Sequence, residues 1–266
     1  MRAGAVLALV FFTATGARAD LTTAYEGFNY APGSGLSGQN GGTGWIGDWF
    51  SPGGLDATVT AQSLLFGGLG FSGGALSTAG FQPSNQGSSV ATWIRDLNTP
   101  LGADGTTVYF SFLLRPDAGY GFYGGINIGN LFIGRSGNQS FYGLEGPVNN
   151  INLSTSPVVE GQTVLLVLEA QFQPGDDNLS LFVNPTPGQS QPALPDVVKT
   201  DLDVGTVTDL ILNNYGGYTY DEIRIGSTFA SVTPTPEPAS GVALGTALLC
   251  LTALKWNARR ILRHRG

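Results

Sequence analysis

Short runs of alternating apolar and polar residues recur along the chain, and this period of two is typical of β-strands. In Thr107–Arg115 every second residue from Val108 to Leu114 is apolar, so these side chains share one face of a strand. Val164–Phe172 is apolar almost throughout, which predicts a central strand buried on both faces for most of its length. Both patterns indicate a β-sheet protein with a sizeable core.

Seven further runs have a strand-like pattern: Ala57–Phe66, Ser88–Asp96, Phe122–Gly134, Gln139–Leu144, Leu179–Asn184, Val207–Asn213 and Tyr220–Ile225. Clusters of Gly, Pro, Asn and Asp separate them and predict turns, as at Pro116–Gly119 and Pro174–Asp177. Outside the two ends of the chain, no window of about eleven residues keeps a helical period. Strands at this spacing predict an all-β fold, a two-sheet antiparallel sandwich of jelly-roll type.

The beginning of the chain has the layout of a secretory signal peptide. Arg2 supplies a positive charge, and an apolar run that ends at Phe12 follows it. Ala17 and Ala19 are the small residues that a signal peptidase reads, so we predict cleavage after Ala19. The apolar run is too short to cross ~30 Å of hydrocarbon, which argues against a membrane anchor.

The end of the chain combines a Pro-Glu-Pro tripeptide, an uncharged apolar stretch and a basic tail. The tripeptide is Pro236-Glu237-Pro238, and the sixteen uncharged residues of Ala239–Leu254 follow it. As a helix this stretch spans ~24 Å, which is enough for a membrane segment if the bilayer thins locally. A basic cluster then stops translocation and stays in the cytoplasm. Its members are Lys255, Arg259, Arg260, Arg263 and Arg265.

Together these features resemble the PEP-CTERM sorting signal of Gram-negative bacteria, on Pro236–Ser240, Gly241–Leu254 and Arg259-Arg260. The resemblance implies that an exosortase, an integral-membrane cysteine protease, cleaves near Pro-Glu-Pro and releases or transfers the protein to the surface. A sortase signal is absent, and a glycosylphosphatidylinositol signal would end in its apolar tail. The predicted segments are a signal peptide (1–19), an exterior domain (20–232), a linker (233–238), a transmembrane helix (239–254) and a basic tail (255–266).

Charge and residue types limit what the exterior domain does. Residues 20–235 carry eighteen Asp and Glu against five Lys and Arg, a formal charge of −13, which disfavours nucleic acid as a partner. The only cysteine, Cys250, and the only histidine, His264, lie in the C-terminal segments. The exterior domain therefore lacks the residues for a Ser-His-Asp or Cys-His catalytic set, a disulfide or a His/Cys zinc site.

Four segments carry a second resemblance: Tyr25–Phe28, Asn40–Trp45, Leu181–Pro185 and Tyr220–Gly226. The last of them, Tyr-Asp-Glu-Ile-Arg-Ile-Gly, is the most telling. Together they resemble the concanavalin A-like, LamG-type domains of many exported bacterial proteins, over residues 22–232. That superfamily includes lectins, adhesion modules and glycoside hydrolases, so the resemblance implies a sandwich fold without selecting a function.

A glycosidase of this fold would need two carboxylates on one concave face. Glucanase members of the superfamily carry Glu-x-Asp-x-x-Glu on one strand, and this chain has no such run. Glu169 lies on an apolar strand without an acidic partner two residues away, and Glu145 falls in a predicted Gly-Pro turn. We therefore predict no catalytic residues and a protein that is not an enzyme.

Exposed aromatic side chains that stack on sugar rings are the remaining material for a binding site. The candidate ligand-binding residues lie in Gly-rich segments predicted to be loops, and they are Tyr120, Tyr123, Tyr215 and Tyr218. Asp176, Asp177 and Asn178 form an oxygen-rich turn that would suit Ca²⁺. Plain turn chemistry is the favoured interpretation of that turn.

The leading hypothesis is a non-catalytic surface or extracellular-matrix protein whose exterior domain binds carbohydrate, such as exopolysaccharide, without a cofactor. The alternatives are a polysaccharide-active enzyme and a purely structural surface protein. The expected partners are signal peptidase, an exosortase and the membrane, and not nucleic acid. The protein is expected to pass through the inner membrane, with a transient or stable single-pass stage, to the cell surface or the matrix.

Overall fold

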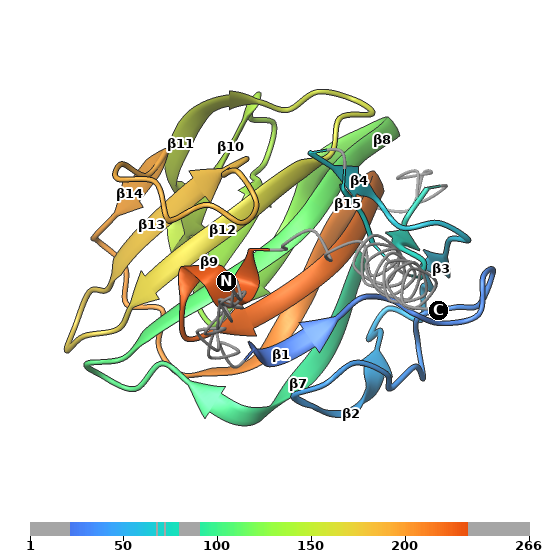
Figure 1. Cartoon of the computed structure of the whole chain (residues 1–266), viewed down its shortest axis with the longest axis horizontal. Helices are drawn as coiled ribbons and strands as arrows, with labels where there is room; N and C mark the ends of the chain where they lie inside the picture. The colour runs from blue at the N-terminus through green and yellow to red at the C-terminus, as the bar shows by residue number, and fades with distance from the viewer. Residues whose placement is uncertain (1–21, 68, 72, 80–90, 234–266) are drawn as a thin grey trace, which may run out of the picture.

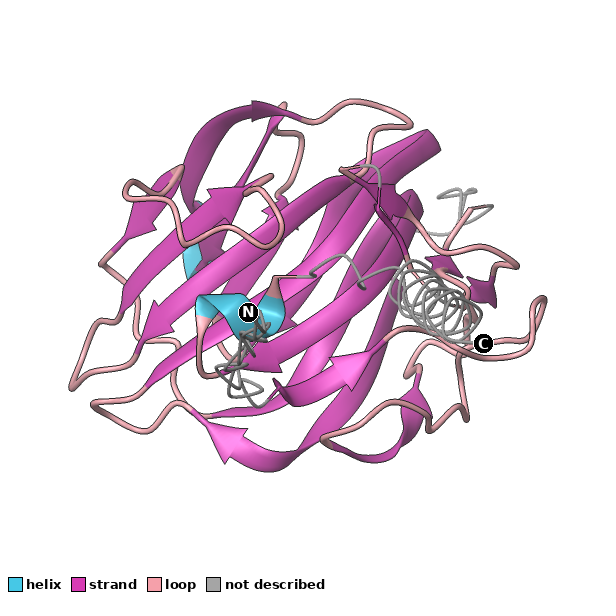
Figure 2. Cartoon of the chain, viewed as in Figure 1, coloured by secondary structure: helices cyan, strands magenta, loops and turns pink. Residues whose placement is uncertain are grey.

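The computed structural model describes residues 22–67, 69–71, 73–79 and 91–233. Fifteen strands make up most of this part, and the described helical segments are one α-helical turn, α1 (Phe229–Val232), and one 3₁₀ turn, Pro147–Asn149 (Figure 2). All the strand pairs are antiparallel. The predicted all-β antiparallel fold is therefore confirmed.

Thirteen of the strands form one hydrogen-bonded sheet that folds into two layers, called here the first and second sheets. Two long strands, β8 (Thr107–Ile128) and β15 (Val207–Gly226), pair with each other and contribute to both layers (Figure 1). The first half of β8 and the second half of β15 belong to the first sheet. That sheet also contains β1 (Thr22–Glu26), β12 (Val164–Gln171), β13 (Asn178–Val183) and β14 (Val197–Lys199).

The second half of β8 and the first half of β15 belong to the second sheet. That sheet also contains β2 (Trp45–Phe50), β7 (Ala91–Leu101), β9 (Leu131–Arg135), β10 (Phe141–Gly146) and β11 (Asn150–Pro157). Short strands complete the fold, namely β3 (Thr58–Val59) and β6 (Leu76–Ser77) beside β15, and a separate hairpin of β4 (Leu65–Phe66) and β5 (Leu69–Gly70).

The core lies between the two sheets. Phe110 and Phe112 of β8, in the predicted alternating run, contact the same core cluster as Leu166 of β12 and Leu212 of the second sheet. The outer face of the first sheet is also covered, by α1 and by the segment around Leu64. The prediction that Val164–Phe172 is buried on both faces for most of its length is therefore confirmed.

The predicted turn at Pro116–Gly119 is wrong, because β8 continues through it. Pro116 lies opposite Tyr218, and the register of β15 shifts on both sides of Gly216. Such bulges bend a strand pair, and a bend accepts a proline that has no N–H to donate. The bend is what carries β8 and β15 from one sheet into the other.

Strand limits also differ from the prediction elsewhere, and β1, β2, β11 and β14 lie outside the predicted runs. The run Phe122–Gly134 is divided by the two-residue turn Gly129-Asn130, in which Gly129 has a positive φ of 49°. The runs Val207–Asn213 and Tyr220–Ile225 belong to the single strand β15. The run Ala57–Phe66 holds two separate strands, β3 and β4.

Candidate functional site

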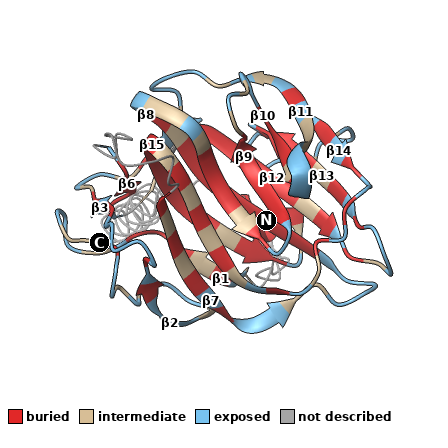
Figure 3. Cartoon of the chain, turned by 180° about the vertical axis from the view of Figure 1, so that it is seen from behind, coloured by how far each residue is buried: buried red, intermediate tan, exposed pale blue. Residues whose placement is uncertain are grey.

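The outer face of the second sheet presents part-exposed side chains between buried ones along β7, β8 and β15 (Figure 3). One row of directly paired residues crosses five neighbouring strands of this face. It runs through Ile94, Ile211, Asn127, Phe132 and Glu145. Side chains of a strand point alternately to its two faces, so the neighbours of these residues along β15 and β9 point into the core.

A row of glycines lies next to it on the same face. Gly125, Gly134 and Gly143 pair directly across β8, β9 and β10. A Cβ added at Gly125 would lie 2.8 Å from Cζ of Phe132, so the Phe132 ring occupies the space above this glycine. A Cβ at Gly134 would lie 2.8 Å from Cα of Gly125. The glycines let aromatic side chains lie close against the sheet.

Over these rows lies a hollow of about 330 Å³, called here the Tyr123 hollow. The ring of Tyr123 meets that of Phe132 edge to face, with 5.5 Å between the ring centroids. The described lining thus combines two aromatic rings, three amide side chains and one carboxylate, and it contains no basic residue. Its members are Tyr123, Asn127, Gly129, Asn130, Phe132, Glu145, Gly146, Pro147 and Asn213.

Both oxygens of the Glu145 carboxylate have partners within the site. The Tyr123 hydroxyl donates to Oε1 at 3.5 Å, and the Ser136 hydroxyl donates to Oε2. Burial and the neighbouring carboxylate raise the pKa of Tyr123, so the phenol stays protonated and remains a donor. The carboxylate is therefore held in a fixed orientation at the edge of the hollow.

Two asparagines from different strands meet at the other side of the hollow. Nδ2 of Asn213 donates to Oδ1 of Asn127 over 2.8 Å. Oδ1 of Asn213 is buried and has no hydrogen-bond donor among the described residues. A buried acceptor without a donor costs free energy, which a donor entering the hollow would recover.

This arrangement suits binding of hydroxyl-rich molecules. Aromatic faces stack on the apolar face of a sugar ring, while amide and carboxylate groups bond its hydroxyls. The described lining has one carboxylate, whereas glycoside hydrolysis by acid and nucleophile or base needs two. Phe132 is only 4% exposed, so the geometry offers stacking on Tyr123 together with hydrogen bonding.

The four candidate tyrosines lie on β8 and β15 and not in loops as predicted. Tyr123 lines the hollow, and Tyr215 lies against the exposed ring of Phe122, with 5.2 Å between the centroids. Tyr120 and Tyr218 meet edge to face at 5.9 Å. The four residues therefore do not form one cluster.

Tyr218 is the clearest correction among them, because its side chain is fully buried. Its hydroxyl donates to the carbonyl oxygen of Gly121 over 2.9 Å. The guanidinium of Arg135 lies 4.8 Å above the neighbouring Tyr120 ring and close to the Tyr218 hydroxyl. Tyr218 is a core residue and has no face open to a sugar.

The turn at Asp176, Asp177 and Asn178 shows turn chemistry. Asp177 is only 2% exposed, and its two carboxylate oxygens accept the backbone N–H groups of Gln173 at 3.0 Å and Val204 at 2.8 Å. Within the described ranges there is no group of three or more Asp, Glu, His or Cys that would hold a metal ion. The carboxylate of Asp177 joins two loops.

The predicted targeting residues lie outside the described part of the chain. They are Ala17 and Ala19, the motif Pro236, Glu237 and Pro238, and the basic residues Lys255, Arg259, Arg260, Arg263 and Arg265. No helix within residues 22–233, as far as these are described, is long and apolar enough to cross a membrane.

Of the nine described residues that line the Tyr123 hollow, only Tyr123 is among the sequence-predicted candidates, which omit Asn127, Phe132, Glu145 and Asn213 in particular. The sequence predicts a Gly-Pro turn at Glu145, but this residue lies on β10, paired with Phe132 of β9. The turn Gly129-Asn130 was the available signal, because a two-residue hairpin fixes which residues of its two strands lie opposite each other.

No family model and no curated protein sequence matches this chain. Among solved structures, it is similar to domain 4 of AbnA, an extracellular arabinanase of family GH43 from Geobacillus stearothermophilus, in complex with arabinotriose. The TM-score is 0.49 and the sequence identity 16%, and the match covers 81% of this chain and 98% of that one. It is also similar to the binding domain of botulinum neurotoxin serotype D, with a TM-score of 0.42 and 10% identity over 73% of this chain and 47% of that one. A third similar structure is the metal-free carbohydrate recognition domain of Emp46p, with a TM-score of 0.29 and 10% identity over 68% of this chain and 88% of that one.

Proposed function

We propose that the exterior domain is a non-catalytic carbohydrate-binding module whose Tyr123 hollow takes a neutral sugar. The observation that carries this proposal is the lining of the hollow, where two aromatic rings lie beside three amides and a single oriented carboxylate. A lining with a carboxylate and without a base favours a neutral glycan over an acidic one. We also propose that the sandwich is a jelly roll of the concanavalin A-like type, which the two-layer antiparallel arrangement supports.

Delivery to the cell surface is the other part of the proposal, and it is supported by the sequence alone. A signal peptide would direct export, and an exosortase would read Pro236-Glu237-Pro238. The membrane would hold the protein during sorting, and the exopolysaccharide of the producing cell would then be the partner of the exterior domain. A matrix protein of this kind needs affinity for its polymer and no catalysis.

The test is retention of the full-length protein in native gels that contain neutral polysaccharides or the producer's own exopolysaccharide. We expect retention of the wild type, and Tyr123→Ala should weaken it about threefold to tenfold, because a stacked ring is lost. Phe50→Ala is the matched control, since Phe50 is an exposed ring (61%) that pairs with Ile94 at the far end of the row, four strands and about 19 Å from Phe132, and it should change retention little.

Three results would contradict the proposal. Equal losses in Tyr123→Ala and Phe50→Ala would mean that the hollow is not the site. Release of new reducing ends from the polymer would support a polysaccharide-active enzyme. Absence of retention on every polymer would support a structural surface protein.

A further inference from the structure

A second hollow, of about 630 Å³, lies against the first sheet and shares no residue with the Tyr123 hollow. Its walls come from β4 and the residues before it, from the loop before β12, and from the residue after β13. We call it the Arg115 hollow. Its described lining is rich in hydroxyl, amide and guanidinium groups and contains no carboxylate: Gln62, Ser63, Leu65, Phe66, Gly67, Arg115, Gly161, Gln162, Thr163 and Asn184.

Arg115 is the most exposed of the five basic residues of the exterior domain. Its side chain is 36% exposed, against 24% for Arg224, which is paired with buried Glu222. Three more are withdrawn from solvent: Arg95 against Glu26, Lys199 against Asp201, and Arg135 among tyrosines. In a domain with a formal charge of −13, the one well-exposed cation therefore lines a hollow.

The guanidinium of Arg115 is held in place on one side only. Its Nε donates to Oδ1 of Asp117 over 2.7 Å, and its Nη2 donates to Oγ1 of Thr219 over 3.2 Å. The Thr219 hydroxyl donates in turn to the other oxygen of Asp117 over 2.6 Å, which closes the network. Nη1 of Arg115 has no partner among the described residues, so one edge of the guanidinium is left to bind a ligand.

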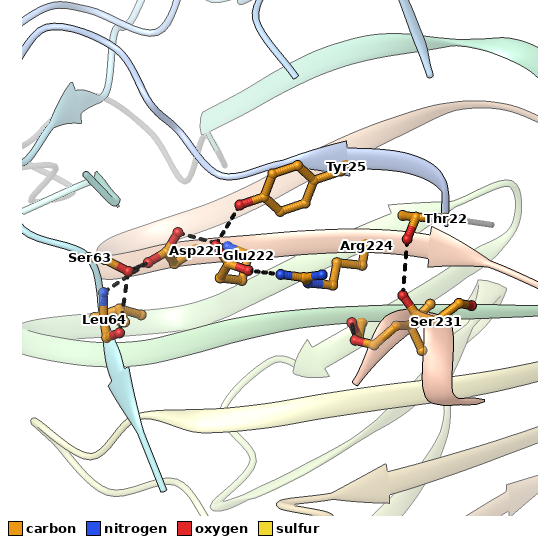
Figure 4. A network of polar contacts seen from close by, with 10 residues as sticks. Thr22, Tyr25, Ser63, Leu64, Asp221, Glu222, Arg224 and Ser231 are labelled. Atoms are coloured by element: carbon orange, nitrogen blue, oxygen red, sulfur yellow. Dashed lines mark hydrogen bonds and ion pairs between the residues drawn. The ribbon is translucent and has the colours of Figure 1, made fainter. Parts of the chain in front are cut away.

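The wall beside Ser63 is fixed by β15. The buried carboxylate of Asp221 accepts the Ser63 hydroxyl and, over 2.9 Å, the backbone N–H of Leu64 (Figure 4). The same close-up shows Glu222, the next residue, held from the other side by Tyr25 and Arg224. The segment that carries Ser63 is therefore tied to the centre of the first sheet.

The opposite walls are fixed in the same way. The N–H of Gly161 donates to the carbonyl oxygen of Pro116 over 2.7 Å. Oδ1 of Asn184 accepts the N–H of Leu165 over 3.0 Å. Both contacts join the walls to strands of the first sheet, and a site whose walls are already ordered binds a ligand at a lower entropic cost.

We infer that the Arg115 hollow is a second saccharide site, one that takes a sugar bearing a carboxylate. The free edge of Arg115 would bond the carboxylate, and the amides of Gln62 and Gln162 would bond the ring hydroxyls. The two hollows differ in their lining, since one contains a carboxylate and no base, and the other contains a base whose partner Asp117 lies outside the lining. The inference does not depend on the Tyr123 hollow binding a sugar.

The test is titration calorimetry of the full-length protein with tetramers of galacturonate, glucuronate and mannuronate, and with the same tetramers after reduction of their carboxyl groups. We expect at least one acidic tetramer to bind and its reduced form to bind about tenfold more weakly or worse. Arg115→Gln should lower the affinity for that tetramer by about tenfold or more, and Arg115→Lys should restore it only in part.

Asn178→Asp is the charge-matched control, because it also makes the protein more acidic by one unit. Asn178 is exposed and begins β13, about 20 Å along the strand from Asn184, so its change should leave the affinity within about twofold. Equal losses in Arg115→Gln and Asn178→Asp would overturn the inference, as would failure of all three acidic tetramers to bind. Binding that Tyr123→Ala abolishes and Arg115→Gln spares would also overturn it.

Discussion

The two sheets of the sandwich use their outer faces differently. The first sheet is apolar on both sides, and its outer face is covered by α1 and the segment around Leu64. The second sheet uses only its inner face for the core, and its outer face carries glycines, amides, aromatic rings and a carboxylate. Because the first sheet supplies two buried faces, the second sheet can leave its outer face open to solvent.

The largest expected effect on stability comes from a substitution on the covered face of the first sheet. Phe182 is buried there and meets Phe229 of α1 edge to face, with 5.8 Å between the centroids. Phe182→Ala should reduce the free energy of unfolding by about 3–5 kcal/mol, because it removes a large buried ring and leaves a cavity. Urea unfolding followed by tryptophan fluorescence measures the change.

Asn127→Ala on the open face of the second sheet is the companion variant. Asn127 is part-exposed and bonds mainly to Asn213, so its loss should cost only about 0.5–1.5 kcal/mol. Similar losses for the two variants would contradict the division into a covered face and an open face.

The sequence predicts the difference between the two outer faces only in part. The alternation in Thr107–Arg115 predicted the inward position of Phe110 and Phe112 correctly, because it depends on one strand alone. A two-residue turn at Gly129-Asn130 also places Phe132 opposite Asn127, because the turn fixes the register of its two strands.

The remaining contacts of the site join strands far apart in the chain. Asn213 of β15 reaches Asn127 of β8 only because β15 returns beside β8. The apolar runs of the two strands carry no signal that pairs them in this register. The burial of Tyr218 follows from the same pairing, which turns a Gly-rich segment into the middle of a long bent strand.

The next prediction concerns the effect of pH on the Asp221 carboxylate, which accepts hydrogen bonds from Ser63 and Leu64 and is called here the Asp221 clamp. Burial, followed by the charge of Glu222, raises the pKa of Asp221 from 3.8 to about 7, although the hydrogen bonds from Ser63 and Leu64 lower it in part. The folded protein holds this proton more tightly than the unfolded chain. The resulting stability is therefore complete below about pH 4 and is lost as the pH rises towards about 7.

We expect the free energy of unfolding to fall by a few kcal/mol, on an order-of-magnitude basis, between about pH 4 and about pH 7.5. Asp221→Asn should reduce the stability at low pH, since its NH₂ group would face a backbone N–H donor, and should show a flatter pH dependence. Arg224 and Glu222, which lie beside the clamp, are unchanged in this variant. The same slope in both proteins would mean that another group causes the pH dependence.

The smallest expected effect on the fold comes from exchanging Pro236-Glu237-Pro238 for Gly-Ser-Gly. The tripeptide lies outside the described residues and begins three positions after Thr233, the last of them. The free energy of unfolding of the exterior domain should therefore change by less than about 0.5 kcal/mol. Sorting should nevertheless fail, because a proline-restrained backbone lowers the ordering cost of binding an extended protease cleft, and glycines do not.

The measurement uses a host that carries an exosortase and an epitope placed after Gly266. In the wild type the epitope should part from the exterior domain, whereas in the variant the two should stay joined and accumulate in the inner membrane. The basic cluster, proposed to hold the far end in the cytoplasm, is the same in both proteins, so only the tripeptide differs. Equal processing of the two would make a simple single-pass anchor the better account, and both sheets would then remain at the inner membrane, out of reach of an external matrix.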